Sequence, residues 1–555
     1  MPSGSRKVPP KIATRGAAQH PTWLLRALLL GVGIGAAVLG LLLVLPYLAA
    51  PRVHSPTMPA ATASTPTTIT PTRAPTSAIE KVACWFTAPP GHTARCGILR
   101  VPERRDAAGA SRQLGLRFAI LGHSTPASTN PIVYISGGPG EAAQIDADSI
   151  GSWWSWMERE PWLHNRDLVL FDQRGVGLSE PRMDCPELVD AAYKVLEQVL
   201  TPAASDSIWA EAAGRCRARL AATGLDLASY NTASIVADLK DLLAQLGYRS
   251  PILLANSYGT RVALRLAADP AIGIRAMVLD SVDPPEAHDY TDSAANAAAA
   301  FAGVFHICAA NAVCNATFPD LAGDFDRSVA RAAQTPLPVT VIDPRGGSLI
   351  AQLDDGKLIE TLFYAFYDAR WLEQLPAMIA AIAQGDTRPL APLVRLGLDN
   401  YDEGGASLGL FLSVECHDDF AFNPRAEVER AAAAVPQFRK FALSNLPLAA
   451  CPAWPVGRAS KAEHAPLTRD VPMLLLSGEL DPATPPRWAE AVAARVPHAY
   501  LFKFPGIGHG VLGTQACASR LVEHFLTNPS QRPRDDCLLA LAPPQFRKVA
   551  NIQAK

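Results

Sequence analysis

The stretch LLANSYGT, residues 253–260, is the strongest local indication of the fold. An apolar strand runs directly into Ser257, and a helical pattern begins at Tyr258. Strand, sharp turn and helix in this order form a nucleophile elbow, in which the turn lifts the serine hydroxyl out of the sheet. The elbow usually has the pattern G-x-S-x-G, whereas this sequence has Ala255 at the first position. Alanine is still small, so this departure strains the elbow without excluding it.

A serine hydroxyl is a weak nucleophile near pH 7 and needs a base, which a carboxylate must hold in the correct tautomer. In folds with this elbow the chain order is serine, then Asp or Glu, then histidine. Asp481 lies in GELDPATPP, directly after an apolar strand, and His509 lies in PGIGHG, directly after the next one. Each alone is equally consistent with an ordinary loop residue. Together with Ser257 they predict a catalytic triad, for which Glu479 is the alternative acid.

A tetrahedral intermediate also needs hydrogen-bond donors for its oxyanion. The backbone N–H of Tyr258, directly after the serine, is the first expected donor. The second is expected in the loop SGGPG, where Gly137 and Gly138 permit a close approach of backbone N–H groups. The alternative for this loop is an ordinary tight turn. We also expect Asp172 and Arg174, in DQRGVGLS, to pair and brace the glycine loop, with a structural role.

Short apolar runs alternate with helical patterns along much of the chain. These predicted strands are residues 115–121, 131–136, 167–172, 251–256, 276–282, 472–477 and 499–504. A helical pattern before the fourth run stops at Gly247. Alternation of this kind predicts a mostly parallel, doubly wound α/β sheet. We therefore predict an α/β-hydrolase fold whose core comprises residues 80–282 and 471–555. The Ala-rich, mainly helical stretch 283–470 is the inserted cap domain, over the sheet edge where ligands bind.

Three segments precede the predicted core. Residues 1–22 carry four basic residues and no acidic one, which predicts a cytoplasmic N-terminus. Residues 23–49 contain an apolar run long enough to span a bilayer, so we expect a transmembrane anchor and an exported catalytic domain, periplasmic or extracellular. The alternative is a cleaved signal peptide and a secreted protein. Residues 50–79, rich in Pro, Thr and Ser, predict an extended linker.

The composition fits a globular protein, with 49% hydrophobic and 18% charged residues. Its 50 basic and 52 acidic residues give a net charge of −2 without a basic stripe, which argues against a nucleic-acid partner.

Ten cysteines, all after the apolar segment, indicate disulfides formed in an oxidising compartment. Pairing between sequence neighbours is a hypothesis, because sequence does not determine connectivity. The pairs would be Cys84–Cys96, Cys185–Cys216, Cys308–Cys314, Cys416–Cys451 and Cys517–Cys537. His306, Cys308 and Cys314 could alternatively form a partial zinc site, but a fourth ligand at the usual spacing is missing, so we expect no metal.

Several motifs together resemble the proline iminopeptidase and tripeptidyl aminopeptidase group of α/β-hydrolases. They are GGPG (137–140), DQRGVGLS (172–179), NSYGT (256–260), GELDPATP (478–485) and GHG (508–510). CHDD (416–419) and CPAW (451–454) resemble cysteine-bearing segments of the tripeptidyl aminopeptidase branch. The resemblance implies an exported serine exopeptidase that cleaves short units from peptides with a free N-terminus, without a metal or organic cofactor. Ser136 in place of the usual histidine, and Ala255 in place of glycine, argue against strict proline specificity.

An aminopeptidase needs a carboxylate that binds the substrate ammonium group. Glu415, Asp418 and Asp419 on the cap are candidates, and the alternative is that they are solvated surface acids beside a disulfide. An exported carboxylesterase or lipase-like hydrolase with the same triad is the competing enzyme function. A cap that presents acids toward Ser257 would favour the peptidase, and an apolar acyl groove the esterase. A non-catalytic binding protein would be favoured by loss of a triad member, and none is lost.

Overall fold

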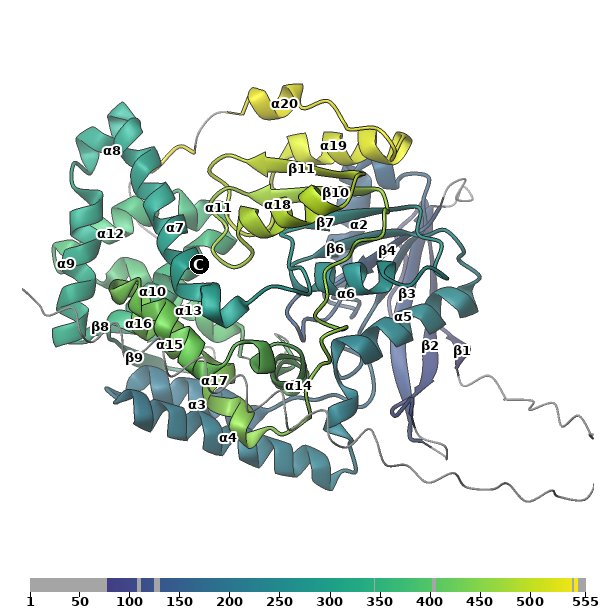
Figure 1. The fold of residues 1–555 in the computed structure, drawn as a ribbon, viewed down its shortest axis with the longest axis horizontal. Helices are drawn as coiled ribbons and strands as arrows, with labels where there is room; N and C mark the ends of the chain where they lie inside the picture. Colours follow the sequence, from purple (N-terminus) through teal and green to yellow (C-terminus); the bar gives the residue numbers. More distant parts are fainter. Residues whose placement is uncertain are drawn as a thin grey trace, which may run out of the picture. The chain divides into compact units, whose positions relative to one another are not determined.

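The computed structural model describes residues 77–106, 111–123, 130–343, 345–401, 406–541 and 544–547 (Figure 1). The predicted cytoplasmic N-terminus, the apolar segment and nearly all of the linker lie outside these residues.

A nine-stranded sheet in the described residues has the order β1-β2-β3-β5-β4-β6-β7-β10-β11. The strands are β1 (Ala78–Val82), β2 (His92–Pro102), β3 (Gln113–His123), β4 (Ile132–Ile135), β5 (Leu168–Phe171), β6 (Ile252–Asn256), β7 (Ala276–Asp280), β10 (Met473–Gly478) and β11 (Ala499–Phe504). The strands from β5 to β11 in this order are parallel, whereas β1, β2 and β3 are antiparallel. The sheet confirms the predicted α/β-hydrolase fold, and each predicted strand is present within two residues of its expected bounds.

Helices cover both faces of this sheet, so its central strands are buried on both sides. One face packs against α5 (Thr232–Leu246), α6 (Tyr258–Ala267) and α18 (Pro486–Arg495). The other packs against α2 (Ile150–Arg159) and α19 (Ala516–Thr527). The predicted end of α5 is confirmed, because Gly247 adopts the left-handed conformation and caps the helix.

The cap lies between β7 and β10 in the sequence and has an apolar core of its own. Its helices are α7 (Asp289–Ala310), α8 (Ala312–Thr317), α9 (Leu321–Gln334), α10 (Asp355–Phe363), α11 (Ala369–Leu372), α12 (Leu375–Ala383), α13 (Ala391–Asp399), α14 (Leu408–Asp418), α15 (Arg425–Ala433), α16 (Arg439–Leu443) and α17 (Leu446–Ala450). A hairpin of β8 (Leu337–Ile342) and β9 (Ser348–Leu353) was not predicted. Within the described residues α7 is long and apolar enough to cross a membrane, but its Phe301 packs in the core of the cap.

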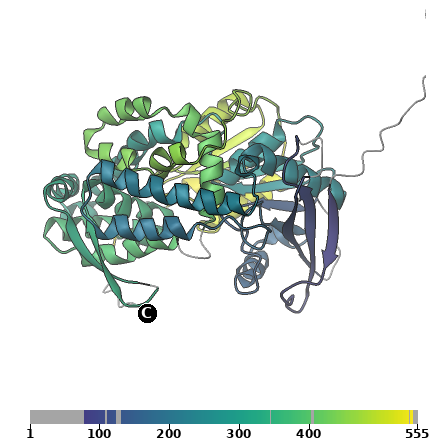
Figure 2. The ribbon, with the colours of Figure 1, turned by 90° about the horizontal axis from the view of Figure 1, so that it is seen from below.

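Two long helices from the predicted first half of the core pack against the cap. They are α3 (Pro186–Glu197) and α4 (Pro202–Ala222). Both views show them running beneath the cap helices and away from the sheet (Figures 1 and 2). Helix α3 contacts β9, and α4 contacts α17, so this pair completes the cap from an earlier part of the chain.

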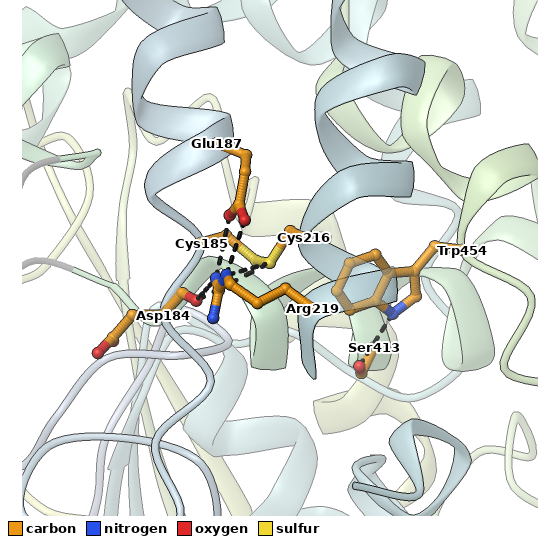
Figure 3. The surroundings of a disulfide bond; sticks show 7 residues. All are labelled: Asp184, Cys185, Glu187, Cys216, Arg219, Ser413 and Trp454. Carbon is orange, nitrogen blue, oxygen red and sulfur yellow. Dashed lines mark hydrogen bonds and ion pairs between the residues drawn. A yellow bond between two sulfur atoms is a disulfide. The ribbon is translucent and has the colours of Figure 1, made fainter. Parts of the chain in front are cut away.

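The ten cysteines form five disulfides, each between sequence neighbours. Cys185–Cys216 joins the start of α3 to α4, and Arg219 beside it donates to both carboxylate oxygens of Glu187 (Figure 3). Cys308 and Cys314 are bonded to each other, so their sulfurs are not free thiolates for a zinc site. Five disulfides indicate an exported protein.

Candidate active site

Ser257 lies in the sharp turn between β6 and α6 that the sequence predicts. Its φ of 51° and ψ of −132° are unusual for a residue with a side chain, which is the strain expected of a nucleophile elbow. A Cβ on Gly259 would lie 2.3 Å from the carbonyl oxygen of Ile135 in the neighbouring strand. Glycine is therefore needed at this position of the motif, because α6 and β4 nearly touch.

The end of β7 connects the serine turn to the histidine loop. The carbonyl oxygen of Asp280 accepts a hydrogen bond from Ser257 N at 2.9 Å. Its carboxylate accepts bonds from the backbone N–H groups of Val511 and Leu512, and Ser281 Oγ accepts one from Gly510 N. One strand end therefore fixes both loops, which brings residues more than 200 positions apart in the sequence to the same sheet edge.

The predicted acid and base are in direct contact. His509 Nδ1 lies 3.0 and 2.9 Å from the two carboxylate oxygens of Asp481. The Asp481 carboxylate also accepts bonds from the backbone N–H of Ala483 and from the N–H and hydroxyl of Thr484, which fix its orientation. With Nδ1 donating to the carboxylate, Nε2 is the ring nitrogen left to act as a base.

Electrostatics around the histidine favour its charged form. Burial by itself lowers the pKa of His509, but the charge and hydrogen bond of Asp481 outweigh it, so the pKa is raised. Glu479, the alternative acid, instead accepts a hydrogen bond from the backbone N–H of Gly506. Among the two acids proposed from sequence, Asp481 is therefore the one that holds the imidazole.

The glycine loop lies against the turn that contains Ser257. A Cβ on Gly137 would lie 3.1 Å from Ser257 Cβ and 3.2 Å from Glu141 Oε2. Tyr258 is the first residue of α6, where backbone N–H groups have no partner within the helix. Ser136 donates to the carbonyl oxygen of Glu141 and accepts from Gln173, so it holds the loop closed. Gly138 adjoins these groups, with a φ of +99°.

The prediction that Asp172 and Arg174 pair with each other is wrong, because each has a different partner. Asp172 accepts hydrogen bonds from the backbone N–H groups of Ala143 and Leu178, and so braces the segment after the glycine loop. Arg174 points away and forms a buried bidentate ion pair with Asp238 of α5. Asp172 is satisfied by backbone donors, which sequence spacing does not reveal.

The three cap acids are buried, so the alternative that they are solvated surface residues is wrong. Glu415 accepts a hydrogen bond from Tyr290, and Asp418 accepts one from Thr232 N. Asp419 forms an ion pair with Arg261 of α6. Glu415 and Asp419 belong to a set that we name the Arg261 network, whereas Asp418 is not a member. Its members are Arg261, Asp283, Asp289, Tyr290, Glu415 and Asp419.

Burial raises the pKa of the acids in this network, and the charges of neighbouring acids add to the shift for Glu415 and Asp419. Burial, and then the charge of Asp419, raises the pKa of Glu415 to about 8. Burial also raises the pKa of Asp419 to about 6, although Arg261 opposes the shift. Arg261 is on α6, four residues after Ser257, so the network holds the helix that positions the nucleophile.

Residues that the sequence did not single out also surround His509. The backbone N–H of His509 donates to the carbonyl oxygen of Phe366, in the 3₁₀ turn η4 (Tyr364–Tyr367) of the cap. A Cβ on Gly508 would lie 2.0 Å from that oxygen, so glycine permits this approach. The ring of Tyr367 lies 4.7 Å from the imidazole ring, centroid to centroid. Glu141 was not singled out from the sequence, although its place directly after GGPG was a usable signal, whereas nothing in the local sequence marked η4.

Two parts of the chain match known protein families. Residues 130–312 match the alpha/beta hydrolase fold family, and residues 436–537 match the family described as TAP-like protein. The serine protease Hip1 of Mycobacterium tuberculosis, like that of Mycobacterium bovis, is 27% identical over 469 residues, which are 79% of this chain and 86% of the relative.

Two solved structures show weaker likeness. Proline iminopeptidase of Mycobacterium smegmatis is 14% identical, with a TM-score of 0.31 over 75% of this chain and 96% of that one. The α/β hydrolase MGS-M2 from a Medee basin deep-sea metagenome library is 15% identical, with a TM-score of 0.33 over 76% and 97%. These matches identify the chain as a serine hydrolase with an α/β-hydrolase fold and a TAP-like domain, distantly related to Hip1.

Proposed function

We propose that the protein is a serine aminopeptidase that removes short peptide units from free N-termini. The observation that carries this proposal is the carboxylate of Glu141, which lies against the serine turn and forms no ion pair in the described part of the chain. Desolvation raises the pKa of this carboxyl, and the charge of His509 only partly opposes the rise. A carboxylate near the nucleophile attracts a positively charged substrate, whereas a neutral acyl ester gains nothing from it.

In the proposed reaction, Ser257 Oγ attacks the scissile carbonyl carbon while His509 Nε2 takes the hydroxyl proton. The resulting oxyanion accepts hydrogen bonds from backbone N–H groups of Tyr258 and of the loop that contains Gly137 and Gly138. Protonated His509 gives its proton to the leaving amine, and the C–N bond breaks to leave an acyl-enzyme. Water then attacks the ester, again with His509 as base, and releases the acid and Ser257. Asp481 orients the imidazole throughout and stabilises its charged form.

The test compares four chromogenic substrates with the full-length chain. They are a tripeptide anilide with a free amine, its N-acetylated twin, a single-residue proline anilide and a short-chain acyl ester. We expect the free-amine tripeptide to be cleaved with a kcat/KM at least tenfold above that of the acetylated twin. Turnover of the ester alone would assign the protein to the carboxylesterases, and equal turnover of both peptides would contradict an exopeptidase.

We also propose that residues 23–49 anchor the exported enzyme in a membrane. The apolar run and its basic flank support this, since they fit a signal anchor with a cytoplasmic N-terminus. The test is alkaline extraction of membranes from expressing cells, followed by sequencing of the mature N-terminus. Retention in the membrane with residues 1–22 present is the expected result, and a soluble protein that begins near residue 50 would contradict it.

A further inference from the structure

A cavity in the cap and the ring of His509 lie at opposite ends of the 3₁₀ turn η4. Tyr367 contacts His509, and Tyr364 at the other end of the same turn lines a cavity of about 80 Å³. The turn is about 6 Å long, at roughly 2 Å per residue. The cavity is formed between α3 and α4 on one side and α10 and α13 on the other.

The walls of this cavity combine aromatic rings with one carboxylate. Trp209, Tyr364 and Tyr401 supply the aromatic surface, and Trp209 and Tyr401 stack with centroids 5.9 Å apart. Glu360 lines the same cavity, and its one hydrogen bond within the described residues is a long one, 3.5 Å, from the hydroxyl of Tyr364. We name these four residues the Glu360 pocket. Aromatic faces and a carboxylate together attract an organic cation.

The nearest protein cation does not neutralise Glu360. Lys357 also lines the cavity, but its ammonium group donates to the carbonyl oxygens of Val195, Gln198 and Gln352. Burial raises the pKa of Glu360 to about 7, although Lys357 opposes the shift. A ligand ammonium beside Glu360 would relieve this desolvation, because an opposite charge favours the ionised carboxylate.

A second cavity lies beside the Glu360 pocket, near the segment that follows the glycine loop. This cavity, of about 210 Å³, is lined by Ala142 next to Glu141, by Ser407 and also by Tyr401. Tyr401 therefore borders both cavities.

We propose that the Glu360 pocket binds the N-terminal ammonium group of the peptide substrate and so sets the length of the unit removed. This inference rests on the proposed aminopeptidase function and refines it. Glu415, Asp418 and Asp419 already have protein partners behind α6, whereas Glu360 faces a cavity. An extended chain spans about 3.3–3.6 Å per residue, so one residue is too short to reach past η4 from the serine. The unit removed is then a dipeptide or tripeptide.

The experiment measures kcat/KM of the full-length chain with Glu360→Gln on the same four substrates. We expect a fall of about 10- to 100-fold on the free-amine tripeptide, the range for losing a charged hydrogen-bond partner. Turnover of the ester and of the acetylated tripeptide should stay within about twofold. The matched control is Glu427→Gln on the exposed face of α15, which should change none of these rates.

The outcomes separate this inference from the proposed function. If the unmodified enzyme does not prefer the free amine, the aminopeptidase function itself fails. If it does, and Glu360→Gln leaves that preference intact, the pocket is not the ammonium site, and loss of preference in Glu141→Gln would place it beside the serine. Should Glu360→Gln lose ester turnover through misfolding, Tyr401→Leu tests the same pocket, with an expected rise in KM of several-fold for the free amine. An unchanged KM in that variant would overturn the proposal.

Discussion

The acids on the two sides of Ser257 differ in what holds them. Behind the elbow, the Arg261 network shares one guanidinium among three aspartates and pairs Glu415 with a tyrosine. On the substrate side, Glu141 lies at the glycine loop and Glu360 at a cavity, and neither forms an ion pair in the described part of the chain. The difference teaches that acidity alone does not identify a binding group. An acid with protein partners braces the fold, whereas an unpaired acid at a cavity is available to a ligand.

The largest expected effect is that of removing the nucleophile, a change that leaves both sets of acids intact. Ser257→Ala removes the predicted nucleophile but none of the contacts of the Arg261 network. We expect peptide hydrolysis to fall by roughly 10⁴- to 10⁶-fold, because residual catalysis comes from the oxyanion donors and binding alone. The midpoint of thermal unfolding should stay within a few degrees, since alanine keeps the backbone conformation and the hydrogen bond from the backbone N–H at this position. Hydrolysis at an unchanged rate would remove Ser257 from the mechanism.

Arg261→Met tests whether the buried set is structural. The change leaves the buried Asp283 and Asp419 and the partly exposed Asp289 without their cation. Breaking a buried ion pair on one side costs about 3–5 kcal/mol of unfolding free energy, measured here by urea denaturation. Arg425→Met is the matched control, because Arg425 makes exposed ion pairs of little expected value. A loss in Arg261→Met no larger than in the control would contradict the bracing role.

Glu415→Gln tests the same network through pH. Burial raises the folded-state pKa of Glu415 to about 8, above the unfolded value near 4.3. The folded protein then binds this proton more tightly than the unfolded chain does. The stability that protonated Glu415 contributes is therefore complete below the unfolded pKa and is lost as pH rises toward 8. Glutamine mimics the neutral acid, so the variant should gain on the order of 1–2 kcal/mol relative to wild type between pH 5 and 8. Parallel stability curves for the two proteins would show that Glu415 is ionised in the fold.

Sequence predicted those features that local pattern determines. The central strands β4, β5, β6, β7 and β10 were visible as continuous apolar runs because both of their faces are buried. Asp481 and His509 were found because loops after parallel strands meet at one edge of the sheet. By contrast, β1 and β2 escaped prediction, since β1 is mostly exposed and β2 begins with exposed positions at the edge of the sheet.

The contacts that sequence did not predict are those between distant segments. CHDD looks like a solvated surface motif because its partner Arg261 lies 158 residues from Asp419. Likewise, α3 and α4 are amphipathic or polar helices whose patterns do not say which apolar surface they cover. Glu360 has the spacing of an ordinary polar position on α10, and its cavity appears when four separate helices and η4 come together.

The smallest expected effect is a pH dependence of the preference for a free amine, which distinguishes Glu360 from the acids of the Arg261 network. Its readout is the ratio of kcat/KM for the free-amine tripeptide to that for its acetylated twin, which cancels the titration of His509. Burial raises the pKa of Glu360 to about 7; Lys357 opposes this shift and Asp354 adds to it. The hydroxyls of Tyr364 and Tyr401 are the other titratable groups near this carboxyl.

An ammonium group binds the ionised carboxylate, so the ratio should rise several-fold between about pH 5.5 and 7.5, and fall again as the substrate amine loses its proton near pH 8. Glu360→Gln should flatten the rising limb, whereas Glu415→Gln should leave it in place. A rising limb that survives in Glu360→Gln but disappears in Glu415→Gln would reverse the comparison, because the buried set would then sense the substrate. Both limbs retained in both variants would assign the titration to Glu141, the remaining unpaired acid beside the serine.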